Sequence, residues 1–203
     1  MKRRIRVLAV GGAVAAMSVV STAGATNWHH SGLLAAGGET TVALDAGAGA
    51  ALQSLGVAVA PLGTATAGPA GIAFPITVAK LNPQSLEGRI GHTGGLSFTT
   101  AKTKVDLRRF TIKVNSAPSL SGIASVNGKV VGRLDLFTLD LSKLKVDKTD
   151  EQLTLSGVTL KLTKGAADAL NGSFGVTAFT EGLTIGSATV DTDVISGPRH
   201  WHK

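Results

Sequence analysis

The sequence predicts an all-β protein: an antiparallel β-sandwich or flattened barrel with two short capped helices and an internal duplication. Three observations lead to this prediction. Apolar and polar residues alternate over several segments, two short segments have helical spacing instead, and these two segments resemble each other. Alternation with a period of two is typical of half-buried strands. A chain dominated by such strands forms a sandwich or a barrel.

The first 25 residues have the three parts of a secretory signal peptide. Four basic residues and no acidic residue precede an uncharged apolar run from Val7 to Val20. Ala23 and Ala25 then form the small-x-small site that signal peptidase cleaves. The run is shorter than the ~20 residues of a membrane-spanning helix. We therefore expect cleavage before Thr26 and a mature chain without a transmembrane span, secreted or associated with the cell envelope.

The rest of the chain divides into a linker at residues 26–38, one β domain at 39–194 and a tail at 195–203. The sequence contains no cysteine, which excludes disulfides, cysteine zinc sites and iron–sulfur clusters. Loss of the signal's four basic residues lowers the net charge from +7 to +3 (7 − 4), and aromatic residues make up only 4%. A nucleic-acid partner is therefore not expected. The oligomeric state is left open.

Alternation marks the main strands of the domain. Apolar residues alternate with polar ones over residues 105–114, 134–142 and 153–162. In each segment the phase of the alternation changes once, in one case beside Gly157. Such phase changes predict β-bulges, where one extra residue shifts the following side chains to the other face.

Two local signals refine the order of the strands. Asn127 and Gly128 stand between two apolar runs, which is the signature of a two-residue hairpin turn. Pro75 lies within the apolar segment Ile72–Val78. Since proline cannot donate a ladder hydrogen bond, this segment is expected at a sheet edge or at the start of a strand.

Two segments carry complete signals for short helices. Each begins with an N-cap side-chain oxygen, continues with apolar residues at helical spacing and ends at a glycine that can take a left-handed conformation. The caps and glycine stops are Asp45 and Gly56 for residues 46–55, and Thr163 and Gly175 for residues 164–174.

The two helical segments also belong to a longer internal similarity. Thr41–Ala48 parallels Thr159–Ala166, and Leu62–Thr66 parallels Ile185–Thr189. The shared pattern is a strand, a capped helix, a glycine stop and a later segment of small residues. We interpret it as an internal duplication in which each helix covers one end of the sheet. It is not a solenoid, because two distant copies give no short period.

No catalytic constellation is present in the sequence. A strained G-x-S-x-G nucleophile turn is absent, so we expect no catalytic residues and no enzyme; a hydrolase with an unrecognised site is the alternative. His92 is the only histidine of the β domain and lies in the glycine-rich segment Arg89–Phe98. It is interpreted either as a turn or surface histidine or as a residue that contacts a ligand.

The two ends of the chain share a second candidate site. Each end combines imidazole and indole groups, and the two ends could meet in a sandwich whose first and last strands are neighbours. Four imidazoles brought together could bind zinc, copper or nickel. The alternative is that both ends are mobile. The candidate metal ligands are His29, His30, His200 and His202.

The chain resembles the HtaA-type domain of exported and surface-attached actinobacterial proteins over most of residues 39–194. The similar motifs are Gly71–Ile76, Glu87–Phe98, Leu136–Ser142 and Leu162–Ala167. The resemblance implies a β-sandwich with short helices, display on the cell envelope and, in the best-known members, haem capture during iron uptake.

The sequence departs from the haem-binding members at their ligand. Those members use an axial tyrosine near the start of the domain, supported by a histidine, whereas this chain has no tyrosine. His92 is then the internal candidate for a haem ligand. We expect an exported, non-catalytic binding or interaction domain with no certain cofactor. The alternative is a haem- or metal-binding module for iron or haem uptake, with haem or a cell-envelope component as its partner.

Overall fold

The computed structural model describes residues 33–35, 37–82 and 84–195, all within one compact unit, Ser31–Lys203. The predicted signal peptide, most of the predicted linker and the tail from residue 196 lie outside the described residues. The described part contains a thirteen-stranded antiparallel sheet and two helices. No helix in it is long and apolar enough to cross a membrane.

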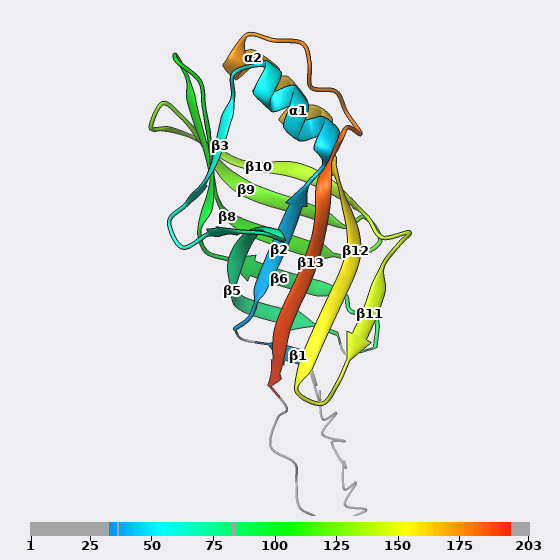
Figure 1. Ribbon diagram of the computed structural model, residues 1–203. Helices are drawn as coiled ribbons and strands as arrows, with labels where there is room; N and C mark the ends of the chain where they lie inside the picture. The colour runs from blue at the N-terminus through cyan, green and yellow to red at the C-terminus, as the bar shows by residue number, and fades with distance from the viewer. Residues whose placement is uncertain (1–32, 36, 83, 196–203) are drawn as a thin grey trace, which may run out of the picture. The chain divides into compact units, whose positions relative to one another are not determined.

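Eight of the strands form a closed antiparallel ring (Figure 1). Around the ring they follow the order β13 (Thr184–Ile195), β2 (Glu39–Leu44), β5 (Gly71–Leu81), β6 (Gly88–His92), β8 (Lys104–Val114), β9 (Ser119–Val126), β10 (Lys129–Asp140) and β12 (Gln152–Leu162). Pairing of β12 with β13 closes the ring. The predicted all-β antiparallel fold is thus confirmed, and ring closure makes it a barrel.

Five short strands are added to the barrel. They are β1 (Leu33–Ala35), β3 (Ala58–Leu62), β4 (Thr66–Gly68), β7 (Gly95–Thr99) and β11 (Lys145–Lys148). β3 pairs with β7, which pairs with the first half of β8, so these strands extend the wall on one side. β1 pairs with β13 and β5 although it lies in the predicted linker.

The predicted bulges are present. In β8 the register shifts between Arg108 and Thr111, and Arg109 takes a φ of 52°. In β12 the register shifts around Gly157, whose φ is 78°. A Cβ at Gly157 would lie 2.2 Å from the Lys143 carbonyl oxygen. Glycine is therefore required there by both its conformation and the close backbone approach.

The hairpin prediction is confirmed, whereas the position predicted for Pro75 is wrong. Asn127 and Gly128 have φ values of 49° and 82° and join β9 to β10, as a type I′ turn requires. Pro75 lies inside β5, an inner strand between β2 and β6. Its carbonyl accepts a hydrogen bond from Thr93 N, just beyond the end of the β5–β6 ladder. The N–H and C=O of a strand residue point to the same side, so the N–H that Pro75 lacks would also face this place. The β5–β6 ladder therefore loses no hydrogen bond.

Both helices form with the predicted caps. Helix α1 (Ala46–Ser54) begins at Asp45, whose carboxylate accepts hydrogen bonds from two backbone N–H groups. Helix α2 (Lys164–Phe174) begins at Thr163 and ends at Gly175 with a φ of 68°. The two helices lie side by side across the same end of the barrel (Figure 1).

The structure reproduces only part of the repeated pattern that suggested a duplication. In both copies a barrel strand leads directly into a capped helix, β2 into α1 and β12 into α2. The later segments differ, because Leu62–Thr66 covers the end of β3, a turn and the first residue of β4, whereas Ile185–Thr189 lies inside the long strand β13. The duplication therefore stays an interpretation of the sequence.

Candidate functional site

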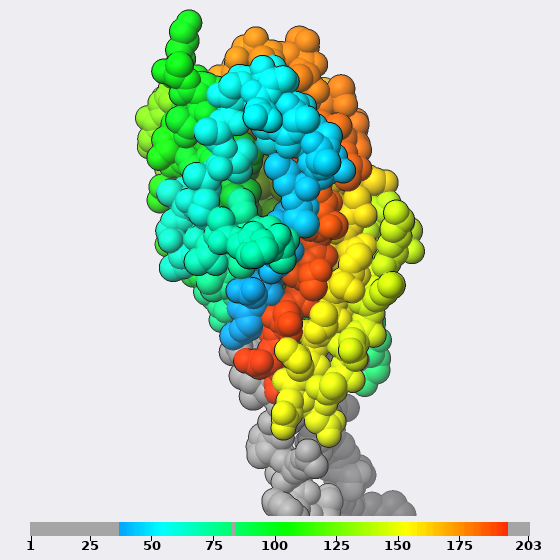
Figure 2. Space-filling model, viewed as in Figure 1, coloured from blue at the N-terminus to red at the C-terminus, as the bar shows by residue number. Residues whose placement is uncertain are grey.

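The barrel is filled at one end and hollow at the other. Leu81, Ile90 and Leu153 are almost completely buried in the filled end. The hollow end, beneath the two helices, contains a cavity of about 630 Å³. Figure 2 shows the surface hollowed between β2 and β3. Both the barrel wall and the helices therefore shape the cavity.

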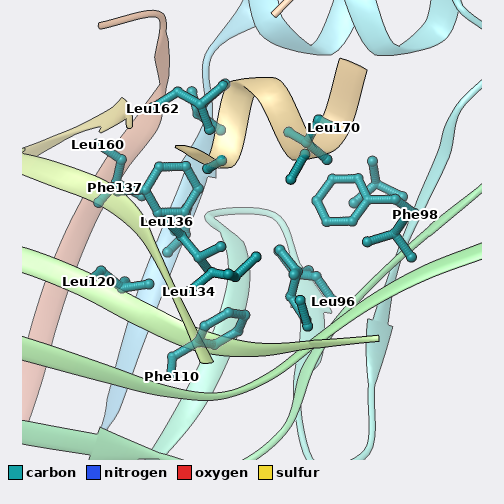
Figure 3. A pocket seen from close by; sticks show the side chains of 18 of the residues that line it. Leu96, Phe98, Phe110, Leu120, Leu134, Leu136, Phe137, Leu160, Leu162 and Leu170 are labelled. Carbon is teal, nitrogen blue, oxygen red and sulfur yellow. The ribbon is translucent and has the colours of Figure 1, made fainter. Parts of the chain in front are cut away.

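Large aliphatic and aromatic side chains make up most of the cavity wall (Figure 3). They come from β7, β8, β9, β10, β12 and α2: Leu96, Phe98, Phe110, Leu120, Leu134, Leu136, Phe137, Leu160, Leu162 and Leu170. The ring of Phe74 meets that of Phe110 edge-to-face with centroids 5.2 Å apart. Such a lining favours an apolar molecule, since each contact removes apolar surface from water.

Few polar side chains reach the cavity, and none of them carries a charge at neutral pH. The polar lining residues are Thr40, His92, Thr103, Asn127 and Ser173. A buried charge without a partner is costly. The cavity therefore selects against ligands whose charged groups would enter it.

The helices close the hollow end of the barrel through small and apolar residues. Leu52 of α1 and Ala166 and Leu170 of α2 line the cavity. The capped starts fix both helices, because the backbone N–H of Asp45 donates to Ile185 O and that of Thr163 donates to Leu136 O. Each helix is thereby attached to a strand of the barrel.

His92 lies at the end of β6, between the hollow and filled parts of the barrel, and is only 5% exposed. Its Nε2 lies 2.7 Å from Thr40 Oγ1, and its Nδ1 lies 3.3 Å from the Phe110 carbonyl oxygen. A carbonyl can only accept, so Nδ1 carries the proton and Nε2 accepts from the Thr40 hydroxyl. The interpretation of His92 as a turn or surface residue is wrong; a ligand-contacting role remains a proposal.

Burial keeps His92 neutral. It lowers the pKa of the imidazole from 6.5 to about 4, while the hydrogen bond to the Phe110 carbonyl opposes this change. At neutral pH the ring is therefore uncharged, and the lone pair of Nε2 accepts the hydrogen bond from Thr40, which lines the cavity together with His92. This lone pair is the group in the described lining that is best suited to bind a metal ion.

The glycines around His92 serve close backbone packing rather than display of the imidazole. A Cβ at Gly94 would lie 2.6 Å from Ala65 N, and one at Gly95 would lie 2.2 Å from Leu107 O. These contacts bring β7 against β8 and the loop before β4. The sequence signal was therefore correct about special backbone geometry but not about exposure.

The structure gives little support for other sites in the described part of the chain. No group of three His, Asp or Glu residues there could hold a metal ion. The candidate ligands His29, His30, His200 and His202 lie outside the described residues, so the terminal metal site stays a prediction.

Thr40 and His92 form the hydroxyl–imidazole pair that nucleophilic catalysis would need. The group behind the imidazole is a neutral carbonyl, however, and the low pKa makes His92 a weak base. A binding role therefore suits this pair better than catalysis.

The sequence analysis missed the cavity and Thr40. Alternating apolar residues indicate which side chains face inward, but they do not give the volume left between them. Thr40 and His92 are 52 residues apart, and only the ring order β2–β5–β6 brings them together. The alternation in Glu39–Leu44 gave a weak signal that Thr40 faces inward.

The fold and the cavity define the class: a closed antiparallel barrel with a helix-covered apolar interior, an architecture that encloses small molecules in other proteins. Three solved structures from Corynebacterium glutamicum have the same fold. The C-terminal domain of HtaA aligns with a TM-score of 0.65 and 13% identity, covering 80% of this chain and 99% of that domain. The N-terminal domain of HtaA gives 0.59 and 15%, with 80% and 99% covered. The heme binding protein HtaB gives 0.55 and 10%, with 81% and 96% covered.

These likenesses confirm the resemblance at the level of the fold: the chain has the fold of an HtaA-type domain. That fold is a closed barrel here, and not the β-sandwich that the resemblance implied. No family model matches the sequence, and no curated protein matches it.

Proposed function

We propose that this domain is a non-catalytic binding module that holds one small apolar molecule in its barrel cavity. The cavity itself supports this proposal, because its volume of about 630 Å³ lies within the range of small-molecule sites. Its wall carries no charged side chain. Titration with the neutral fluorophore N-phenylnaphthylamine tests the proposal. We expect saturable binding of one probe per chain; an unsaturable signal would count against it.

Haem is the specific ligand that we infer for this cavity. HtaB, which shares the fold, is described as a heme binding protein. The orientation of His92 also favours haem, because metal-binding histidines commonly donate their second N–H to a carbonyl, as Nδ1 does to Phe110 O. Histidine is an established protein ligand of haem iron.

The residues present fit haem at its iron and restrict how the rest of the molecule can lie. His92 Nε2 would be the ligand, in place of the hydrogen bond that it now accepts from Thr40. No basic side chain lines the cavity, so the propionates of a bound haem would find no ion-pair partner there and would have to stay in contact with water. Bound haem would supply an iron centre, and the apolar wall would shield the macrocycle.

Haemin titration of the wild-type chain and of His92→Ala tests this assignment. We expect a saturable Soret band for the wild type and its loss or displacement in the variant. Thr40→Val keeps His92 and removes the competing hydroxyl, so its haemin affinity should equal or exceed that of the wild type. Identical spectra and affinities for wild type and His92→Ala would exclude His92 as the ligand. Absence of saturable haemin binding would exclude haem but not another apolar ligand.

We further propose that the domain acts outside the cytoplasm, secreted or at the cell envelope. The basic start, the apolar run and the Ala23-x-Ala25 site support this proposal. The intact mass of the secreted chain should correspond to a start at Thr26. A secreted chain that retains Met1 would contradict it.

A further inference from the structure

Two valines beside the cavity, at the start of β10, are exposed to solvent. Val130 and Val131 are 65% and 61% exposed, more than any other large apolar side chain that the structure describes. They follow the β9–β10 turn. The backbone N–H of Asn127 donates to Lys104 O, and its side chain accepts from Lys104 N. The β9–β10 turn is thus fixed against the end of the β7–β8 turn.

The segment that forms these turns is strongly basic. Residues 101–134 contain seven Lys or Arg and one acidic residue, Asp106. After the predicted signal peptide, with its four basic residues, the rest of the chain has nine basic residues (20 − 4 − 7) and twelve acidic ones (13 − 1). The positive charge is therefore concentrated on β8, β9, β10 and their turns.

Part of this charge is not neutralised by the protein. Asp106 is buried and forms ion pairs with Arg108 and Lys104 at 3.2 and 3.5 Å. Lys102 and Lys129 are exposed and form no ion pair with the described residues. We call the exposed set the basic tip: Lys102, Lys104, Lys129, Val130 and Val131.

The basic tip is continuous with the cavity. Four residues in or beside the β7–β8 and β9–β10 turns line the cavity: Thr103, Val126, Asn127 and Val131. Of these, Asn127 and Val131 are also exposed to solvent. These residues therefore mark an opening of the cavity. Apolar side chains flanked by lysines match a lipid surface, because valine can enter the acyl boundary while lysine reaches anionic headgroups.

We propose that the basic tip docks on an anionic lipid surface, so that an apolar ligand passes between the lipid and the cavity. The docking step rests on the exposed valines and the local charge. The transfer step rests on the proposed function. A purely polyanionic partner is disfavoured, since it would not explain two adjacent exposed valines at the opening.

Vesicle co-sedimentation tests the docking step. The chain from Thr26 onward, which retains the whole compact unit, is mixed with phosphatidylcholine vesicles with or without phosphatidylglycerol. Binding should require phosphatidylglycerol and weaken with added salt. Lys129→Glu should weaken it by about tenfold, and Val130→Ser by several-fold. The matched controls Lys145→Glu and Val146→Ser, exposed on β11, should bind as the wild type does.

Three results would overturn the proposal: no binding to the anionic vesicles, equal binding to neutral vesicles, or equal losses in the β11 controls. Lys129 and Val130 do not line the cavity, so their variants should bind N-phenylnaphthylamine with wild-type affinity. Failure of docking with normal probe binding would leave the cavity function intact. Failure of probe binding with normal docking would refute only the cavity function and the transfer step.

Discussion

At the scale of single residues, His92 connects the stability of the barrel to the chemistry of the cavity. Its ring is buried, uncharged and held at both nitrogens, by Thr40 and by the Phe110 carbonyl. Protonation would place a charge in the apolar interior and would abolish the ability of Nε2 to accept a hydrogen bond. Acid should therefore destabilise the folded chain through this one residue.

The size and sign of this effect follow from the pKa of His92. Folding lowers this pKa from 6.5 to about 4, so the unfolded chain binds the proton more tightly. The stabilisation is complete above pH 6.5 and is lost as the pH falls through about 4; its full value is about 3 kcal/mol.

Urea unfolding at pH 7 and pH 4.5 checks this, with His92→Gln as the variant that cannot titrate. Between these two pH values the wild type should lose about 2–3 kcal/mol more stability than the variant. Equal losses would show that His92 is not held neutral.

Sequence reasoning could select His92 but could not determine its environment. His92 is the only histidine of the predicted β domain, so elimination sufficed to find it. Its partner Thr40 is 52 residues away, and its other partner Phe110 lies within the bulge of β8. Both contacts depend on strand neighbours, which local patterns do not specify.

At the scale of elements, α2 illustrates how local capping chemistry sets the limits of a helix. Gly175 ends the helix with a φ of 68°, whereas Gly165 lies within it at ordinary helical angles. A Cβ at either position would meet no atom within 4 Å. The two glycines therefore differ in backbone conformation but not in the room available for a Cβ atom. They form a matched pair of sites for substitution.

Alanine at these two positions should have opposite effects on stability. Gly175→Ala should destabilise the chain by about 1 kcal/mol, because alanine disfavours the left-handed conformation. Gly165→Ala should stabilise it by up to about 1 kcal/mol, because alanine favours the helix. The midpoints of thermal unfolding check both. Equal shifts of the same sign would contradict the assigned end of the helix.

Elements with complete local signals were predictable, and those defined by distant pairing were not. Both caps, the Asn127-Gly128 turn and the bulge at Gly157 depend on a few adjacent residues. The edge position predicted for Pro75 failed because ring closure provides β5 with neighbours on both sides. β1 lies in the predicted linker, because a strand of three residues is too short to show alternation.

At the scale of the whole molecule, closure of the barrel is what creates a site. Pairing between β12 and β13 closes the eight strands into a ring, and the two helices cover its hollow end. A sandwich with the same alternation would bring its two apolar faces together and leave less room. Alternation indicates one buried face in either case, so the sequence could not distinguish an enclosed cavity from a filled core.

At the scale of the whole molecule, the chain has no tyrosine that could serve as a haem ligand. The fold is shared with HtaB, a heme binding protein, at only 10% identity. The ligand must therefore follow from this chain's own cavity: an apolar wall, no lining charge and one neutral imidazole. These features favour a largely apolar molecule that carries no charge inside the cavity.

The most direct test compares probe binding in variants that differ only in whether the new side chain enters the cavity. Ala124 is buried and lines the cavity, so Ala124→Trp must occupy part of its volume. Ala169→Trp narrows the cavity from α2, and Ala50→Trp adds the same indole on the exposed face of α1. Unfolding midpoints confirm that each variant is folded.

The measurement is the fluorescence titration with N-phenylnaphthylamine. We expect one saturable site in the wild type and in Ala50→Trp, and a loss of affinity of at least tenfold in folded Ala124→Trp, with a smaller loss in Ala169→Trp. Equal affinity in all four folded chains would show that the probe binds elsewhere and that the barrel cavity is not the binding site.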